Sequence, residues 1–192
     1  MNQTQDFTKG VIWKQLLFFF FPILIGSFFQ QLYNTVDTII VGQAVGTSAL
    51  AAVGSTGNLT SLIVNFYVGL STGASVVIAQ YYGAQNKKKI HQAVHTSYML
   101  AIVSGILMML FGLFFSYQCL DAIGTPHDIL NDATLYMQLY FLCMIPGAIY
   151  NIGAGILRAV GDSKRPLYYL IVCSIVNVVF DFIFVVIFHQ GI

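Results

Sequence analysis

Two aspartates, Asp37 and Asp181, stand inside otherwise apolar stretches of this sequence, in YNTVDTIIVG and NVVFDFIF. An ionised carboxylate at the centre of a bilayer costs about 2.5–3.5 kcal/mol on insertion scales, so such a residue usually faces the interior of a helix bundle and acts there. Two desolvated carboxylates placed together can take up and release a proton, and with amide and carbonyl oxygens they can coordinate a hard cation such as Na⁺. Solvation of each aspartate at the end of a span is the alternative.

Other polar side chains share a helical face with these aspartates. In the first and fifth apolar stretches their spacing includes i, i+3 and i+7, and in the fourth the positions are roughly in line, which places each set on one side of a helix. Three such polar stripes in an apolar chain predict a hydrated cavity between helices, lined by the first, fourth and fifth apolar stretches. The stripes consist of Ser27, Gln30, Asn34 and Thr38 with Asp37; Ser174 and Asn177 with Asp181; and Tyr136, Tyr140, Gly147 and Asn151.

The composition requires a membrane around these residues. Of 192 residues, 57% are hydrophobic and only 8% are charged, whereas soluble domains average roughly 25% charged residues. A membrane-spanning helix needs ~20 mostly apolar residues. We therefore predict an all-α, polytopic transmembrane bundle with about five spans, at residues 15–38, 48–82, 93–117, 131–158 and 167–188.

Proline and glycine indicate where these helices bend or end. Pro22 and Pro146 lie inside apolar stretches, where each removes a backbone donor and is expected to kink or weaken its helix. The segment 125–128, TPHD, is typical of a helix start with Pro at the first position. The segment 161–166, GDSKRP, predicts that Gly161 ends one helix and that Pro166 opens the next.

The basic residues predict the orientation of the chain. With five spans, all eight Lys and Arg residues fall on one side, which the positive-inside rule assigns to the cytoplasm together with the N-terminus. The net charge of +1 gives no indication of a nucleic-acid partner. We expect a multi-pass protein of the plasma membrane. The basic residues are Lys9, Lys14, Lys87, Lys88, Lys89, Arg158, Lys164 and Arg165, and Asp121, Asp128 and Asp132 fall on the opposite side.

Two patterns suggest other chemistry and are weaker. Ser71 lies in GLSTG, which matches the nucleophile pattern GxSxG, but no strand precedes it; helix packing through Gly69 and Gly73 is the expected role of that segment. His91 and His95 have the i, i+4 spacing of a metal pair, without a third ligand nearby in the sequence. We therefore predict that the protein is not an enzyme and has no structural or catalytic metal.

Several short motifs follow one another in an order that is similar to one known family. They extend over nearly the whole chain, and on this basis the sequence resembles the N-terminal half of a multidrug and toxic compound extrusion (MATE) transporter. The motifs are Pro22, VDTIIVG at 36–42, ALAAVG at 49–54, QYYGA at 80–84, LRAVGD at 157–162, Pro166 and NVVFD at 177–181.

The resemblance implies an antiporter of twelve helices in two six-helix lobes, which exchanges H⁺ or Na⁺ for organic cations or amphipathic drugs and uses no other cofactor. It implies a coupling-ion site at Asp37, Asn177 and Asp181, with Asn151 contributing. It also implies that helix bending occurs at Pro22. A second asparagine that some members carry falls at Ala154 here, a departure from the family pattern. Gln30, Asn34, Tyr136, Tyr140 and Ser174 are expected to line the cavity.

Residues 1–192 would then form the N-terminal lobe without its sixth helix, and we expect that this chain does not transport by itself, because alternating access needs two lobes. The expected partners are the lipid bilayer, the transported compounds and the remaining C-terminal half. Two alternatives remain open at this point. One is a lipid-linked oligosaccharide flippase of the same superfamily, and the other is a membrane remnant or partner subunit without transport activity.

Overall fold

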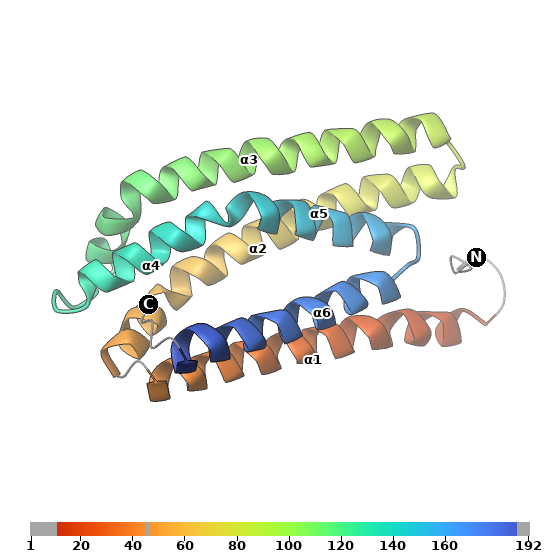
Figure 1. Cartoon of the computed structure of the whole chain (residues 1–192). Coiled ribbons are helices and arrows are strands. Elements are labelled where there is room, and N and C mark those ends of the chain that lie inside the picture. Colours follow the sequence, from red (N-terminus) through yellow and green to blue (C-terminus); the bar gives the residue numbers. More distant parts are fainter. Residues whose placement is uncertain (1–10, 45–46, 188–192) are drawn as a thin grey trace.

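The computed structural model describes residues 11–44 and 47–187, without the side chains at positions 33, 37, 40–44, 47–50, 181 and 185–187. The described chain is a bundle of long helices that run roughly parallel to one another (Figure 1). The helices are α1 (Ile12–Ala44), α2 (Thr47–Gly83), α3 (Lys87–Ala122), α4 (Leu130–Leu142), α5 (Met144–Ala159) and α6 (Lys164–Asp181), followed by the π-helix η1 (Phe182–Ile187).

The helices confirm the prediction of an all-α membrane bundle with about five spans. In the described part of the chain, α1, α2, α3 and α6 are each long and apolar enough to cross a bilayer. The helices α4 and α5 pass the same test only as a pair, bent by 50° where they meet. The fourth predicted span, 131–158, is therefore two short helices, which together are long and apolar enough for one crossing.

Pro146 explains the bend between α4 and α5. A proline has no N–H to donate and its ring clashes with the carbonyl four residues earlier, which here belongs to Leu142, the last residue of α4. The helix consequently ends at Leu142 and restarts at Met144. Pro22 has a milder effect, since α1 continues through it as one helix.

Three helices end in the same hydrogen-bonded turn. At the end of α5, Gly161 has a φ of 85°, its N–H donates to Arg158 O (3.0 Å), and the N–H of Asp162 donates to Leu157 O (2.9 Å). This pair of bonds is the Schellman motif, which needs a left-handed residue. Gly124 takes that position after α3, with a φ of 80°. After α2 the position is held by Gln85, with a φ of 52°.

The helix starts differ from the sequence prediction at one place. We predicted that 125–128 opens a helix, but residues 126–129 form a turn with a bond from Ile129 N to Pro126 O (3.2 Å), and α4 begins at Leu130. The single i to i+3 hydrogen bond at 126–129 closes a turn, and the α-helix starts only after it. The segment 161–166 behaves as predicted, because Asp162 Oδ1 accepts the N–H groups of Lys164 (3.2 Å) and Arg165 (3.1 Å) and caps α6.

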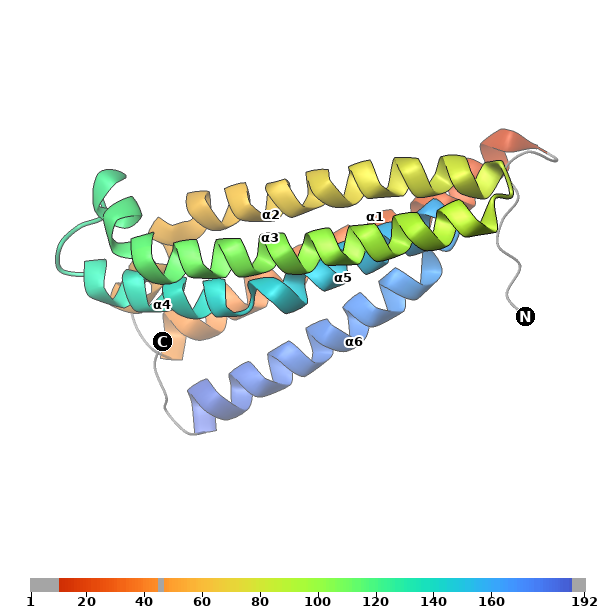
Figure 2. The same cartoon turned by 90° about the horizontal axis from the view of Figure 1, so that it is seen from above.

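The helices form two groups. The helices α2, α3, α4 and α5 pack on one another, and α1 and α6 lie side by side along them (Figure 1). Seen from above, α6 starts beside α5 and diverges from α4 and α5 toward its C-terminal end (Figure 2). The helix α6 is therefore close to α5 at one end of the molecule and separated from α4 at the other, whereas α1 stays in contact with α2.

Glycines permit the close crossings within each group. A Cβ on Gly112 of α3 would overlap the Phe141 ring of α4, and one on Gly105 would lie 3.1 Å from the Ile145 Cα of α5. In the other group, Gly26 of α1 is buried against Leu170 of α6. Small residues at such points let helix backbones approach in lipid, where packing rather than water exclusion holds helices together.

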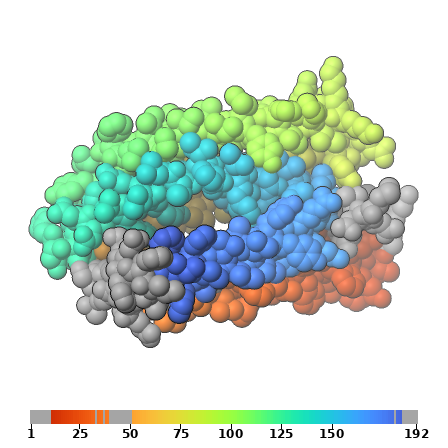
Figure 3. Space-filling model, in the orientation of Figure 1, coloured from red at the N-terminus to blue at the C-terminus, as the bar shows by residue number. Residues whose placement is uncertain are grey.

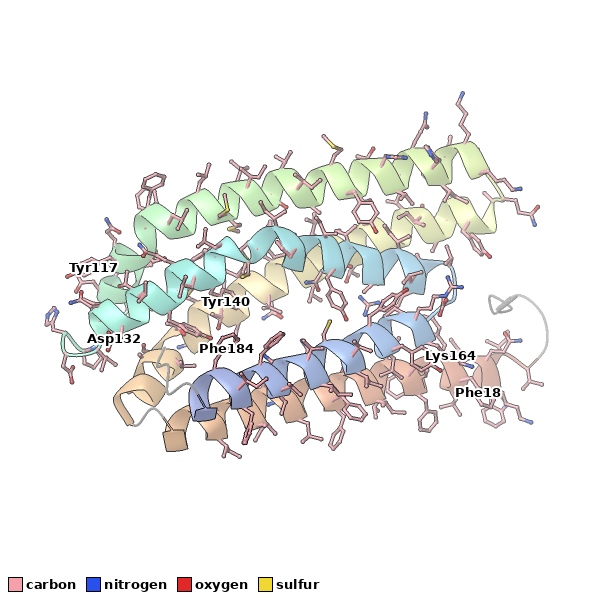
Figure 4. The ribbon with its side chains drawn as sticks, in the orientation of Figure 1. Phe18, Tyr117, Asp132, Tyr140, Lys164 and Phe184 are labelled. Carbon is pink, nitrogen blue, oxygen red and sulfur yellow. The ribbon has the colours of Figure 1, made fainter. Side chains whose placement is uncertain are left out.

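The charged residues separate to the two ends of the bundle. Lys164 lies at the end that carries the α2–α3 and α5–α6 turns, and Asp132 lies at the opposite end near the α3–α4 loop (Figure 4). The basic residues of the described chain other than Lys14 lie in or next to those two turns, and Lys14 lies near the start of α1 at the same end. We call this the basic end. The one-sided arrangement agrees with the prediction, and the assignment of the basic end to the cytoplasm stays a prediction.

The left-handed residue after α2 generates a stability prediction. Substituting Gln85→Gly should raise the free energy of unfolding by about 0.5–1 kcal/mol, because a side chain in this region costs roughly 1–2 kcal/mol, partly offset by the greater freedom of glycine in the unfolded chain. The measurement is the unfolding midpoint of both proteins in one detergent. The reverse change, Gly161→Gln, should lower the midpoint. An unchanged or lower midpoint for Gln85→Gly would contradict the strain argument.

Candidate functional site

A hollow separates the two helix groups. In the space-filling view it opens between α5 and α6, with atoms of α2 behind it (Figure 3). The sequence predicted a cavity lined by the first, fourth and fifth spans, which correspond to α1, to α4 with α5, and to α6. The structure adds α2 as a wall.

Asn177 of α6 carries an unpartnered polar atom. Its side chain is half-buried, and its Oδ1 is inaccessible to solvent yet accepts no hydrogen bond from the described residues. A buried amide oxygen without a donor costs about 1–3 kcal/mol. Ser174, one turn earlier on the same face, is buried and satisfied, because its hydroxyl donates to Leu170 O (2.8 Å). The Oδ1 atom of Asn177 can therefore coordinate a cation or accept a hydrogen bond from a protonated group.

Asp181 stands where α6 changes its geometry. It is the last α-helical residue, and the next six residues form the π-helix η1. Short π-helical segments are rare and occur frequently at functional sites, since they realign neighbouring side chains. The backbone places Asp181 one turn beyond Asn177, whereas its side chain lies outside the described part of the structure.

The helix α1, which carries the polar stripe of Asp37, packs beside α6. Gln30 and Asn34 are exposed, and the hydroxyl of Thr38 donates to Asn34 O (2.8 Å). Asp37 lies within α1, but the position of its side chain is not described. Because α1 packs along α6 and η1, the backbone places both acidic segments in the same helix pair.

The tyrosines of α4 lie where α4 and α6 diverge. Tyr136 and Tyr140 are half-buried. Tyr140 projects toward the space between α4 and η1, the side from which Phe184 of η1 projects (Figure 4). Aromatic side chains with a polar tip on one side of a hollow can contact flat apolar molecules and donate a hydrogen bond.

Asn151 lies on α5 and is hydrogen-bonded to α2, whereas Asp37, Asn177 and Asp181 lie on α1 and α6. Its amide nitrogen donates to Gly147 O (2.9 Å) in its own helix, and its main-chain oxygen accepts the hydroxyl of Ser71 of α2 (2.7 Å). Asn151 lies on α5, across the hollow from α1 and α6. The structure does not bring its amide to Asn177, so a contribution to the same site stays a prediction.

Sequence reasoning did not detect a polar face on α2. Asn58, Ser61, Asn65 and Thr72 are all exposed, and their spacing of i, i+3, i+7 and i+14 places them on one side of the helix. The same stripe test that found the other faces identifies this one when it is applied to 48–82. Polar side chains exposed along a spanning helix require water or protein beside them rather than lipid.

The two weaker patterns have structural explanations. Ser71 is buried, its hydroxyl is used by Asn151 O, and its main-chain oxygen accepts the Ser75 hydroxyl (2.7 Å), so no nucleophile faces solvent there. His91 and His95 face each other with 3.1 Å between their Nε2 atoms. No group of three or more His, Cys, Asp or Glu side chains gathers into a metal cluster within the described chain.

Comparison with known proteins identifies the family. The model of the MatE family matches residues 22–183, which is most of the chain. The chain belongs to the MatE family. The probable multidrug resistance protein YoeA of Bacillus subtilis is 31% identical over 175 residues, which cover 91% of this chain and 38% of YoeA. The family confirms the resemblance drawn from the motifs, and its members are membrane transporters rather than enzymes.

Solved structures agree with the fold. An outward-facing multidrug resistance MATE family transporter of the MOP superfamily is 27% identical, with a TM-score of 0.89, over 99% of this chain and 43% of that one. A MOP superfamily transporter from Pyrococcus furiosus, described as having a binding pocket of reverse polarity, gives a TM-score of 0.90 at 27% identity, over 99% of this chain and 42% of that one. This MatE chain thus has the fold of an N-lobe and spans about two fifths of the length of these relatives.

The contact between α2 and α5 generates a prediction. Substituting Gly155→Ala should destabilise the protein by about 1–3 kcal/mol, because the new Cβ would overlap the Ser71 hydroxyl and lie 2.7 Å from Ser75 Oγ, which forces the helices apart. The measurement is reversible unfolding in detergent.

The matched control is Gly69→Ala on α2, where a Cβ meets no atom within 4 Å. This variant should lose no stability and should gain up to about 1 kcal/mol, because alanine has a higher helix propensity than glycine. Equal losses in both variants would show that the α2–α5 crossing does not depend on the close approach at Gly155.

Proposed function

We propose that this chain is the N-terminal lobe of a cation-coupled multidrug efflux antiporter, which exchanges H⁺ or Na⁺ for organic cations or amphipathic compounds across the plasma membrane. The coupling ion binds beside α6, at Asn177 and the carboxylates of Asp37 and Asp181. The observation that carries this proposal is the buried Oδ1 of Asn177, which has no hydrogen-bond partner among the described residues.

The chemistry of these groups suits a proton or a sodium ion. Hard cations prefer carboxylate and amide oxygens. A carboxylate that loses its water beside another negative charge holds a proton more tightly, so protonation and cation binding compete for the same oxygens. Asp181 at the junction with η1 and Asp37 on the neighbouring helix supply the charge, and Asn177 supplies a neutral ligand.

Pro22 supplies a point at which α1 can bend. Since proline has no N–H, the carbonyl of Phe18, four residues earlier, lacks its helical donor, and the helix is weaker there. Ion binding at Asp37 would then shift the equilibrium between bent and straight forms of α1. Because α1 borders the hollow, the bound ion would in this way change the shape of the hollow.

The exposed polar face of α2 supports the proposal that a second lobe packs beside this one. Asn58, Ser61, Asn65 and Thr72 would lie in lipid if the chain acted alone, and a second lobe across a watery pathway removes that cost. The names of relatives such as YoeA favour drugs over lipid-linked oligosaccharides as cargo. The placement of the described basic residues at the basic end, away from the hollow, favours cationic cargo as well.

Cation binding by the purified chain tests the site. Asp37→Asn and Asp181→Asn should each lower the affinity for ²²Na⁺ at least about tenfold, because each removes a charged ligand. If the site binds a proton instead, the same variants should reduce the number of protons released on addition of the cation to a similar extent. Asn177→Ala should lower the affinity about fivefold, the loss expected for one neutral oxygen ligand. The control Asn131→Ala removes an exposed amide at the start of α4 and should leave binding unchanged.

Transport provides the second readout. In a transporter assembled from this lobe and its complement, Asp37→Asn or Asp181→Asn should abolish coupled export of ethidium. Unchanged export in both variants, or equal cation binding in Asn177→Ala and the parent chain, would exclude the proposed site.

A further inference from the structure

A groove on the outside of the bundle has no role in the function proposed above. It lies between α2 and α3 near the basic end and has a volume of about 580 Å³. The wall formed by α2 includes Gly69 and Gly73, where a Cβ would meet no atom within 4 Å. The sequence predicted helix packing through these two glycines, but no helix of the described chain packs against them.

The lining of the groove changes from basic to apolar along its length. Lys89 and Tyr81 lie at the basic end, followed on α3 by Gln92 and Thr96. Leu100 of α3 lies deeper, 11 residues beyond Lys89 and therefore about 16 Å further along the helix. Leu70, Gly69 and Gly73 of α2 face this deeper part. The hydroxyl of Ser97, which also lines the groove, already donates to Ala93 O (2.7 Å).

No acidic side chain of the described residues neutralises the positive charge at the mouth. Lys89 Nζ lies 5.4 Å from the centre of the Tyr81 ring, and Lys87 and Lys88 precede it at the start of α3. Within the described ranges, the ion pair that forms is Arg165 with Asp162, on the far side of the α5–α6 turn. No Asp or Glu lines the groove. The mouth therefore attracts an anion, and the floor accepts an alkyl chain.

We propose that this groove binds an anionic phospholipid of the leaflet at the basic end, with its phosphate beside Lys89 and an acyl chain over Gly69 and Gly73. The gradient from charge to hydrocarbon matches the depth profile of a phospholipid, because anionic headgroups attract basic residues at the membrane surface and alkyl chains occupy the apolar interior. A transmembrane helix from a second lobe would not require a lysine at the mouth with two more lysines next to it at the start of α3.

The groove thus gives the glycines of GLSTG a function. A larger side chain at Gly69 or Gly73 would extend into the space that the acyl chain occupies, since a Cβ at either position meets no protein atom within 4 Å. Bound lipid would join α2 to α3 at a place where their side chains leave a gap, and it would stabilise the folded chain by mass action.

Native mass spectrometry of the purified 192-residue chain tests the proposal. The chain is released from nanodiscs that contain equal amounts of the anionic lipid POPG and the zwitterionic lipid POPC. We expect POPG adducts to exceed POPC adducts, and Lys89→Gln to reduce POPG retention about fivefold, the effect of removing one basic contact with an anionic surface. Gly73→Leu should reduce retention of both lipids while keeping every charge.

The matched control is Lys164→Gln, which removes an exposed lysine at the same end of the molecule but outside the groove. It should leave POPG retention unchanged. Equal losses for Lys89→Gln and Lys164→Gln would show general electrostatic attraction and overturn the proposal, as would equal retention of POPG and POPC by the parent chain. If Gly73→Leu retains both lipids but no longer associates with a separately expressed complementary lobe, the occupant is a protein helix and the proposal is wrong.

Discussion

Helices in lipid must satisfy their polar groups within the protein, because no water is present to accept or donate hydrogen bonds. Many serine and threonine hydroxyls of the described residues follow that constraint. Most of them donate to the carbonyl one turn earlier in their own helix and so contribute little information about function. Examples from every long helix are Ser27 and Thr38 of α1, Thr72 and Ser75 of α2, Ser97 and Ser116 of α3, Thr134 of α4 and Ser174 of α6.

The departures from this rule identify the contacts that organise the molecule. Ser71 donates across to Asn151 O and joins α2 to α5, and Gln138 Nε2 donates to Leu113 O (3.1 Å) and joins α4 to α3. The oxygen of Asn177 is buried and has no donor in the described chain. The first two contacts hold one helix group together, whereas the third is a group that a ligand can satisfy. This contrast is the physical basis for placing the ion site beside α6.

The hollow follows from the distribution of close helix crossings. Gly105, Gly112 and Gly155 allow α2, α3, α4 and α5 to approach one another, and Gly26 does the same for α1 with α6. Each of these close approaches lies inside one group. Between the groups, α6 meets α5 near the α5–α6 turn and diverges from α4 toward its other end (Figure 2), whereas α1 contacts α2. A space between two internally rigid units is suited to a pathway that changes shape, since motion there breaks few packed contacts.

The sequence by itself determined the class of protein, the approximate spans, the turn at 161–166, the basic end and the residues that share a helix face. These properties follow from hydropathy and from 3.6-residue periodicity, which are local. Only the tertiary structure decided what each face meets. It placed the break of the fourth span before Pro146, ended α6 in a π-helix at Asp181, and left Gly69 and Gly73 open while Gly155 is packed. A glycine or a polar stripe has the same local signature whether lipid, water or another helix lies beside it, so spacing alone cannot distinguish these neighbours.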